Sequence, residues 1–150
     1  MGRQCIDEGD YGNAFKYFKK AAELGYIAAH NYLSIMYYKG DGVEKDEEKE
    51  IYHLEEAAIG GHPYARHNLG IKEFNNGRFE RARKHLIIAA NLGDHDSLKE
   101  LRELYADGHA SKEDYATALR SYQAAVEATK SAERERAEKA VKSGEMRYAF

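Results

Sequence analysis

The fold is decided by a five-residue string that recurs along the chain: AAELG at residues 21–25, AAIGG at 57–61 and AANLG at 89–93. A weaker copy, AVEAT, occupies residues 125–129, so successive copies start 36, 32 and 36 residues apart. Self-similarity at a nearly constant period is the signature of a repeat protein. The sequence therefore predicts an array of equivalent units along most of its length.

The residues before each string keep the same register and predict a helix, which we name the B helix of each unit. A bulky set and a small set align there: Phe18, Leu54, Leu86 and Tyr122, then Ala14, Glu50, Ala82 and Ala118. Bulky and small residues at helical spacing form a stripe along which two helices pack closely. The glycine that ends most of these strings fits a left-handed C-cap, which would end the helix.

A second helix, the A helix, is predicted after each of these glycines. Three aligned positions carry it: Ala29, Leu33 and Tyr37; Ala65, Leu69 and Glu73; Ser97, Leu101 and Tyr105. No stretch alternates polar and apolar residues for long, so strands are not expected. The chain is therefore predicted to be all-α and built from antiparallel helix pairs.

The segment from residue 29 to residue 61 resembles a full Sel1-like repeat. The resemblance rests on Ala29, Leu33, Tyr37, Gly40-x-Gly42-Val43, Asp46, Lys49, Tyr52 and Ala57-Ala58-x-x-Gly61. Residues 62–93, whose internal connection is four residues shorter, are similar to a tetratricopeptide repeat, a close structural relative. The resemblance implies a right-handed α/α solenoid. Ser34 and Arg102 depart from the glycine expected after the leucine, and Glu50 departs from the expected alanine.

The expected organisation is a single repeat domain over residues 1–150. Its units are a partial first repeat at 1–25, a second repeat at 26–61, a third, short-loop repeat at 62–93, a fourth at 94–129, and a C-terminal capping helix and tail at 130–150. The register places Met1-Gly2 where Leu69-Gly70 falls, so the chain is expected to open within an A helix, as a fragment of a longer array. Mixed charge at i,i+4 spacing from Thr129 to Ser143 suits either a polar cap or a solvated helix before the Met146–Phe150 tail.

Composition narrows the classes of function. The 43% of hydrophobic residues support a core, and a net charge of -3 leaves no basic excess for a nucleic-acid partner. No apolar run approaches the roughly 18 residues that span a bilayer, so no membrane partner is expected. Cys5 is the single cysteine, which excludes an internal disulfide or a thiolate zinc site and favours a cytoplasmic location.

Seven histidines invite a metal or catalytic hypothesis, but no catalytic residue, cofactor or metal is expected. His53 and His85 share one repeat position, which favours a structural or surface role. His62 and His67 are not part of a zinc motif such as His-Glu-x-x-His. The glycines of Gly40-Asp41-Gly42 lack the strand and the lysine of a phosphate loop, and turn geometry explains them.

A binding surface is expected on the A helices, because the resemblance places ligands on the inner, concave wall that these helices line. The predicted partner-binding residues are Asn31, Ile35, Tyr38, Tyr64, His67, Ile71, Phe74, Lys99 and Glu103. Aromatic and aliphatic groups among polar ones suit the recognition of a peptide or a partner protein. The alternative is that these side chains pack against the adjacent A helix.

The leading hypothesis is accordingly a protein-interaction scaffold or adaptor. One alternative is a hydrolase-like enzyme on a repeat scaffold, an activity proposed for a few proteins of this kind. No nucleophile, base and oxyanion donors converge in the sequence to favour it. The other alternative is a structural segment that self-associates through its truncated repeat ends.

Overall fold

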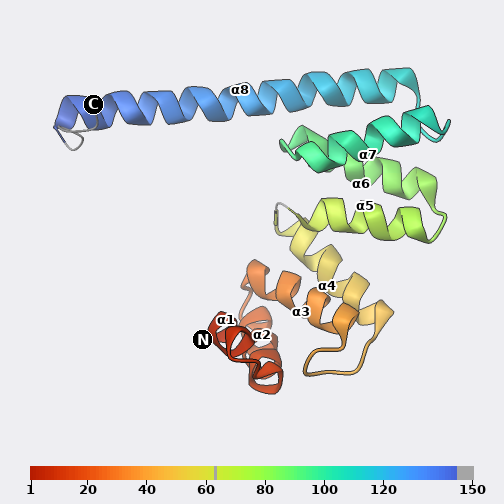
Figure 1. The fold of residues 1–150 in the computed structure, drawn as a ribbon, viewed down its shortest axis with the longest axis vertical. Helices are drawn as coiled ribbons and strands as arrows, with labels where there is room; N and C mark the ends of the chain where they lie inside the picture. The colour runs from red at the N-terminus through yellow and green to blue at the C-terminus, as the bar shows by residue number, and fades with distance from the viewer. Residues whose placement is uncertain (63, 145–150) are drawn as a thin grey trace.

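The computed structural model describes residues 1–62 and 64–144 and confirms an all-α solenoid of antiparallel helix pairs (Figure 1). No strand occurs in these two ranges. The A helices alternate with the B helices in chain order: α1 (Gly2–Asp7), α2 (Tyr11–Glu23), α3 (Ile27–Lys39), α4 (Glu47–Ile59), α5 (Ala65–Asn75), α6 (Phe79–Asn91), α7 (His95–Ala106) and α8 (Lys112–Ser143).

Each helix packs mainly against the helix before it and the helix after it. The pairs follow one another through the stack, from the N-terminal α1 and α2 to α7 and α8 at the opposite end (Figure 1). Helix α6 also packs against α8, the next B helix along the chain. Packing between neighbouring units alone is what defines a solenoid, in which stability is shared among many local interfaces.

The core lies along the stripe that the register predicts. The A-helix leucines Leu33, Leu69 and Leu101 are each at most 1% exposed. The small residues that the register aligns on the B helices are buried as well: Ala14, Ala82 and Ala118. Complete burial of a leucine side chain stabilises a fold by about 1.5–3 kcal/mol, so these repeated positions supply much of the stability of each interface.

Helix ends follow the predicted turn chemistry. Ser111 and Asp114 form the expected capping box at the start of α8, each side chain accepting from the other's backbone N–H. The predicted C-cap glycines Gly25, Gly61 and Gly93 have φ values of 90°, 88° and 94°. In this left-handed conformation a side chain would be strained, which explains why the position is glycine.

Helix α8 differs from the expected separation at residues 129 and 130, because it continues unbroken through that point. Thr129 stands where the other units have their cap glycine, so no residue ends the helix there. Every residue from 127 to 139 is exposed. The expected capping helix is thus a projecting extension of the last B helix, while the Met146–Phe150 tail lies outside the described residues.

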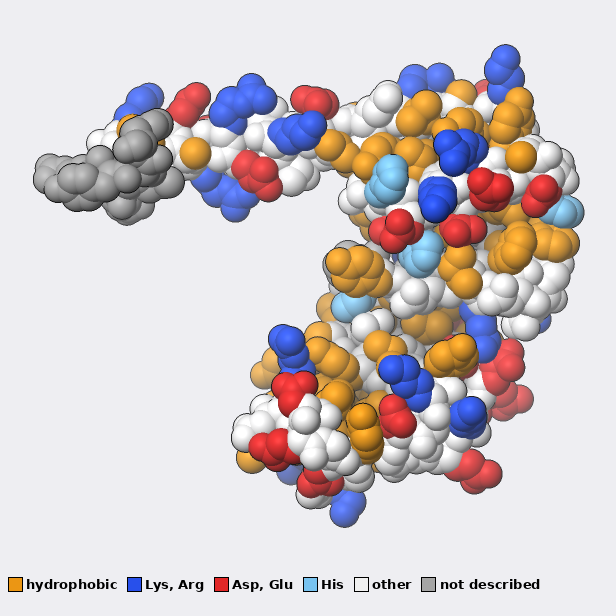
Figure 2. Space-filling model, viewed as in Figure 1, with side chains coloured by type: hydrophobic (Ala, Val, Ile, Leu, Met, Phe, Trp, Pro, Cys, Tyr) orange, Lys and Arg blue, Asp and Glu red, His pale blue; other side chains and the backbone are white. Residues whose placement is uncertain are grey.

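The projecting half of α8, which we call the arm (residues 127–143), is strongly polar. It extends beyond the stack in Figure 1, and Figure 2 shows side chains of both charges distributed along it. At about 1.5 Å per residue, the 32 residues of α8 make a helix of about 48 Å. Within residues 1–62 and 64–144, no helix combines the length and the apolar character needed to cross a membrane.

Candidate functional site

Four of the nine predicted partner-binding residues come together around one hollow of about 370 Å³. Ile35 and Tyr38 contribute from α3, and His67 and Ile71 contribute from α5. The remaining lining residues are Ser34, Glu50, Leu54, Asn68, Lys72, Asn75 and Asn76. We call this space the α3–α5 hollow. Aliphatic, aromatic, amide and charged groups therefore meet at one place between two A helices.

The exposure of these side chains separates a rim from a floor. Tyr38 is 62% exposed, and Ile35 is also exposed. Glu50 and Leu54 are buried on α4, the B helix that connects the two A helices in the chain. A ligand that enters the hollow would therefore meet an aromatic and aliphatic rim first and a buried carboxylate beneath it.

The other five predicted residues lie elsewhere. Phe74 packs edge-on against Phe79 of α6, with ring centroids 5.4 Å apart. Tyr64 is exposed just before α5, and Glu103 is exposed on α7. Lys99 lines a separate hollow of about 310 Å³ at the C-terminal end of the stack.

Asn31, the fifth, is half-buried on α3. Its side-chain oxygen is buried and makes no hydrogen bond within the described part of the chain. The nine residues therefore do not form one continuous surface; the part that comes together belongs to the second and third repeats.

The most notable contact in the hollow is an ion pair that sequence reasoning missed. Lys72 Nζ donates to Glu50 Oε2 at 3.0 Å, and the side chains of Lys72 and Glu50 are only 18% and 9% exposed. The same ammonium lies 5.5 Å from the centroid of the Tyr38 ring. Removing one partner of a buried ion pair is strongly destabilising, because the remaining charge is left without compensation.

The two members of this pair are coordinated departures from the repeat pattern. Glu50 occupies a position that is alanine in the other three B helices, whereas Lys72 occupies the position of the buried residues Met36 and Leu104. Both changes fall at one junction, between α4 and α5. The signal in the sequence was therefore a charged residue at each of two aligned core positions. Sequence reasoning identified Glu50 as a departure from the pattern but not Lys72.

A second buried carboxylate strengthens the next junction and does not face the hollow. Glu73 is 2% exposed and stands where the other repeats have Tyr37 and Tyr105. Its Oε2 accepts from Arg78 Nε, and Arg81 Nε lies 3.7 Å from the same oxygen. The hydrogen bond to Glu73 raises the pKa of Arg78 further above its usual range. The Glu73 contacts thus join α5 to the start of α6.

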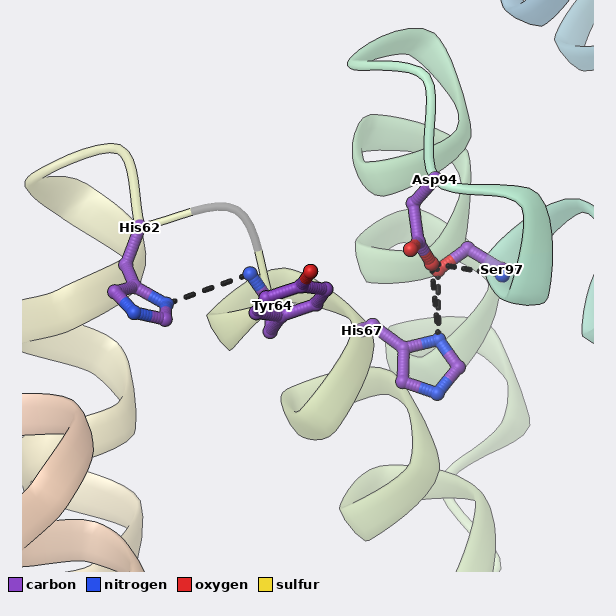
Figure 3. A network of polar contacts seen from close by, with 5 residues as sticks. All are labelled: His62, Tyr64, His67, Asp94 and Ser97. Atoms are coloured by element: carbon purple, nitrogen blue, oxygen red, sulfur yellow. Dashed lines mark hydrogen bonds and ion pairs between the residues drawn. The ribbon is translucent and has the colours of Figure 1, made fainter.

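His67 links the hollow to the start of α7 (Figure 3). Asp94 caps α7 by accepting from the Ser97 backbone N–H at 2.9 Å, and it also accepts from the Ser97 hydroxyl. His67 Nδ1 lies 2.8 Å from Ser97 Oγ and 3.3 Å from Asp94 Oδ2. Since the hydroxyl hydrogen goes to Asp94, Nδ1 is the donor to Ser97, and the second ring nitrogen is left to face away from this contact.

This group of residues does not have the order of a nucleophilic triad. In a triad, one imidazole nitrogen accepts the serine proton and the other donates to the carboxylate. Here Nδ1 alone contacts both partners, and Ser97 is fully buried. The arrangement positions His67 and caps a helix, and it leaves no hydroxyl accessible to a substrate.

His30 and His53 make a further polar contact, between α3 and α4. His53 stacks on Tyr37, with centroids 5.6 Å apart, and contacts His30 through the ring nitrogens. Burial, then the nearby His30 and Lys49, lower the pKa of His53 from 6.5 to about 4. In the part of the chain that the structure describes, no group of three or more histidine, cysteine, aspartate or glutamate residues is placed to hold a metal ion.

Comparison with known proteins places these features in a family context. The family model for the Sel1 repeat matches residues 1–26, 27–62 and 63–94. A crystal structure of a Sel1 repeat protein from Oxalobacter formigenes is similar, with 30% sequence identity and a TM-score of 0.67. The match covers 84% of this chain and 53% of that chain, so this chain spans about half the length of that relative. A comparison with curated protein sequences gave no match.

Proposed function

We propose a binding function on the premise that this chain belongs to the Sel1 repeat family, whose repeats are generally protein–protein interaction modules. The chain acts in this proposal as a scaffold or adaptor for a peptide or a partner protein. The binding surface is the A-helix face, and the α3–α5 hollow is its centre. The observation that carries the proposal is the convergence of Ile35, Tyr38, His67 and Ile71 around that hollow.

The lining of the hollow supports a peptide as the ligand. Ile35 and Ile71 offer aliphatic surface, and Tyr38 offers an exposed aromatic ring, the kinds of side chain that dominate binding energy at interfaces. The side-chain amides of Asn68, Asn75 and Asn76 line the hollow and can donate and accept hydrogen bonds, which suits the N–H and C=O groups of a peptide backbone.

We also propose that the function is not enzymatic. The serine in contact with a histidine and an aspartate, Ser97, is buried and donates its hydrogen to Asp94. A nucleophile requires an accessible hydroxyl with a base positioned to accept its proton. The contacts of His67 support a positioning role in the proposed binding surface.

A capture experiment tests the binding surface. The intact chain is compared with a Tyr38→Ala, Ile71→Ala variant and with a Tyr52→Ala control, since Tyr52 is exposed on α4 and does not line the hollow. Proteins retained by the intact chain and by the control are expected to be absent from the double variant, as measured by quantitative mass spectrometry. Thermal unfolding checks that all three chains fold. Recovery of the same proteins by all three would show that the surface lies elsewhere.

A further inference from the structure

We propose that the α3–α5 hollow recognises a basic side chain of the bound peptide, above all arginine, which takes the place of Lys72 beside Glu50 and Tyr38. The inference rests on the proposed peptide-binding function and names the chemistry of its ligand. It follows from the Glu50–Lys72 ion pair, from the burial of its two members, and from the charge around the hollow.

The hollow already contains a cation site, which the protein fills with its own side chain. Lys72 Nζ lies 3.0 Å from the Glu50 carboxylate and 5.5 Å from the centroid of the Tyr38 ring. A carboxylate and the face of an aromatic ring are the two groups that attract an ammonium or a guanidinium most strongly in proteins. The position of Lys72 therefore marks where an incoming cation would be stabilised.

The two partners differ in how readily they leave this site. The Glu50 side chain is only 9% exposed, and Glu50 is one of the buried residues of α4. Lys72 has a flexible four-carbon stem and is more exposed, so its ammonium reaches water by rotation of the side chain alone. Lys72 is therefore the exchangeable member of the pair.

The sign of the ligand charge follows from this difference. An anionic group that drew Lys72 away would leave Glu50 buried and unpaired, which is the unfavourable outcome for a broken ion pair. A cationic group that displaces Lys72 keeps Glu50 compensated while Lys72 becomes hydrated. Arginine is preferred to lysine, because its planar guanidinium binds a carboxylate through two hydrogen bonds and stacks on an aromatic ring such as Tyr38.

Charge near the hollow is complementary to such a ligand. The segment from Glu44 to Glu50 carries five acidic and two basic side chains. Within it, Glu47 accepts from the rim residue Asn76 at 3.3 Å. An acidic field of this kind speeds the approach of basic ligands and disfavours acidic ones. The aliphatic lining residues Ile35 and Ile71 would contact apolar side chains on either side of the arginine.

Matched peptides test the inference on the full chain. The probes are acetyl-Ser-Leu-Arg-Leu-Ser-amide and two versions in which citrulline or glutamate replaces the arginine; citrulline keeps the shape and removes the charge. Binding is followed by titration of the isotopically labelled chain in two-dimensional NMR. The arginine peptide is expected to bind at least about tenfold more tightly than the citrulline peptide. Its shift changes are expected to centre on α3, α4 and α5.

Two variants assign the preference to the ion pair. Glu50→Ala introduces the residue found at this position in the other B helices and is expected to remove the preference for arginine over citrulline. Lys72→Met introduces the residue at the aligned Met36 and is expected to tighten binding of the arginine peptide, because the internal competitor is gone. If Lys72→Met does not fold, the double variant Glu50→Ala, Lys72→Met is used in its place. This double variant is expected to show no preference for the arginine peptide over the citrulline peptide.

A control variant separates the pair from net charge. Glu48→Gln removes one acidic group from the first turn of α4, but Glu48 is exposed and does not line the hollow. This variant is expected to keep the arginine preference. Tighter binding of the glutamate peptide, equal binding of the arginine and citrulline peptides, no binding of any peptide, or an unchanged preference in Glu50→Ala would each overturn the inference.

The capture experiment keeps the two proposals apart. If Tyr38→Ala, Ile71→Ala loses the captured proteins while the peptides show no arginine preference, the binding surface stands and the basic ligand is rejected. If that variant captures the same proteins as the intact chain, the binding surface itself is rejected.

Discussion

His30 on α3 and His53 on α4 meet through their Nδ1 atoms, which lie 2.9 Å apart, so one ring donates the hydrogen that the other accepts. Protons on both of these nitrogens would place two N–H groups face to face. The pair is further confined because His53 stacks on Tyr37 and packs edge-on against Tyr52. The contact therefore depends on at least one neutral imidazole.

The first prediction is a loss of stability in mild acid. The pKa of His53 is lowered to about 4 by burial, then by His30 and Lys49. Below the unfolded-state pKa of about 6.5 the unfolded chain takes up a proton that the folded chain does not, so the free energy of unfolding falls as the pH drops from about 6.5 to about 4. Burial also lowers the pKa of His62 and His85, which act in the same direction.

Urea unfolding at several pH values between 5 and 7.5 measures this effect. A His53→Gln variant is expected to show a shallower dependence than the intact chain, because one of the contributing groups is gone. A free energy of unfolding that rises toward pH 5 would contradict the prediction.

The second prediction concerns the asymmetry of the Glu50–Lys72 pair. Lys72→Ala leaves a nearly buried carboxylate without its partner and is expected to destabilise the chain by about 3 kcal/mol or more. Glu50→Ala is expected to cost much less, because the Lys72 ammonium reaches water. Chemical denaturation of both variants checks the difference; equal losses would show that Lys72 is as confined as Glu50.

The third prediction compares two helical glycines, one next to a packed side chain and the other next to open space. A Cβ at Gly70 would lie 2.7 Å from Leu86 Cγ, and Leu86 is fully buried. Gly70→Ala is therefore expected to destabilise the chain by about 1–3 kcal/mol. Gly12→Ala on α2 meets no atom within 4 Å and is expected to stabilise by about 0.5–1 kcal/mol. Melting temperatures that shift in the same direction for both variants would refute the packing argument.

The fourth prediction compares an aspartate that caps a helix with one that also accepts a hydrogen bond from a buried hydroxyl. Asp10 caps α2 and Asp94 caps α7. Replacing either aspartate with alanine should lower the free energy of unfolding by about 0.5–2 kcal/mol. Asp94→Ala is expected to cost more than Asp10→Ala, because it also removes the acceptor of the buried Ser97 hydroxyl. Calorimetric unfolding of both variants measures this, and a smaller loss for Asp94→Ala would count against a stabilising role for the bond between Asp94 and the Ser97 hydroxyl.

The fifth prediction concerns the arm. Residues 127–139 are exposed throughout, and an isolated helix of this length is marginal in water. Amide hydrogens of the arm are therefore expected to exchange much faster than those of α6. Hydrogen exchange with mass spectrometry checks this at two protein concentrations. Protection of the arm that grows with concentration would instead indicate that a second copy covers it.

Most of the fold follows from the spacing of a few residue types. Leu33, Leu69 and Leu101 lie in the core because side chains in one register of a repeat meet the same neighbour in every unit. The uninterrupted course of α8 was harder to predict from the sequence. The missing glycine at Thr129 was visible, but mixed charge fits a projecting helix and a capping helix equally well.

The candidate site was predicted only in part, because register gives the face of a helix and not the direction of each side chain. Phe74 has the spacing of a groove residue, yet its ring packs on Phe79 across the short connection to α6. Lys72 was overlooked since lysine is ordinarily a surface residue. Its role depends on Glu50, which is 22 positions earlier in the chain.

The Glu50–Lys72 contact also bears on how such an array grows. A tandem duplication of residues 26–61 would place a second Met36 where Lys72 now stands, so the first Glu50 would face a thioether and have no counter-ion. Loss of residues 62–93 would bring Leu104 to the same place, with the same result. Gain or loss of a unit at this junction would therefore call for a compensating change at Glu50, because the second and third repeats are matched to each other there.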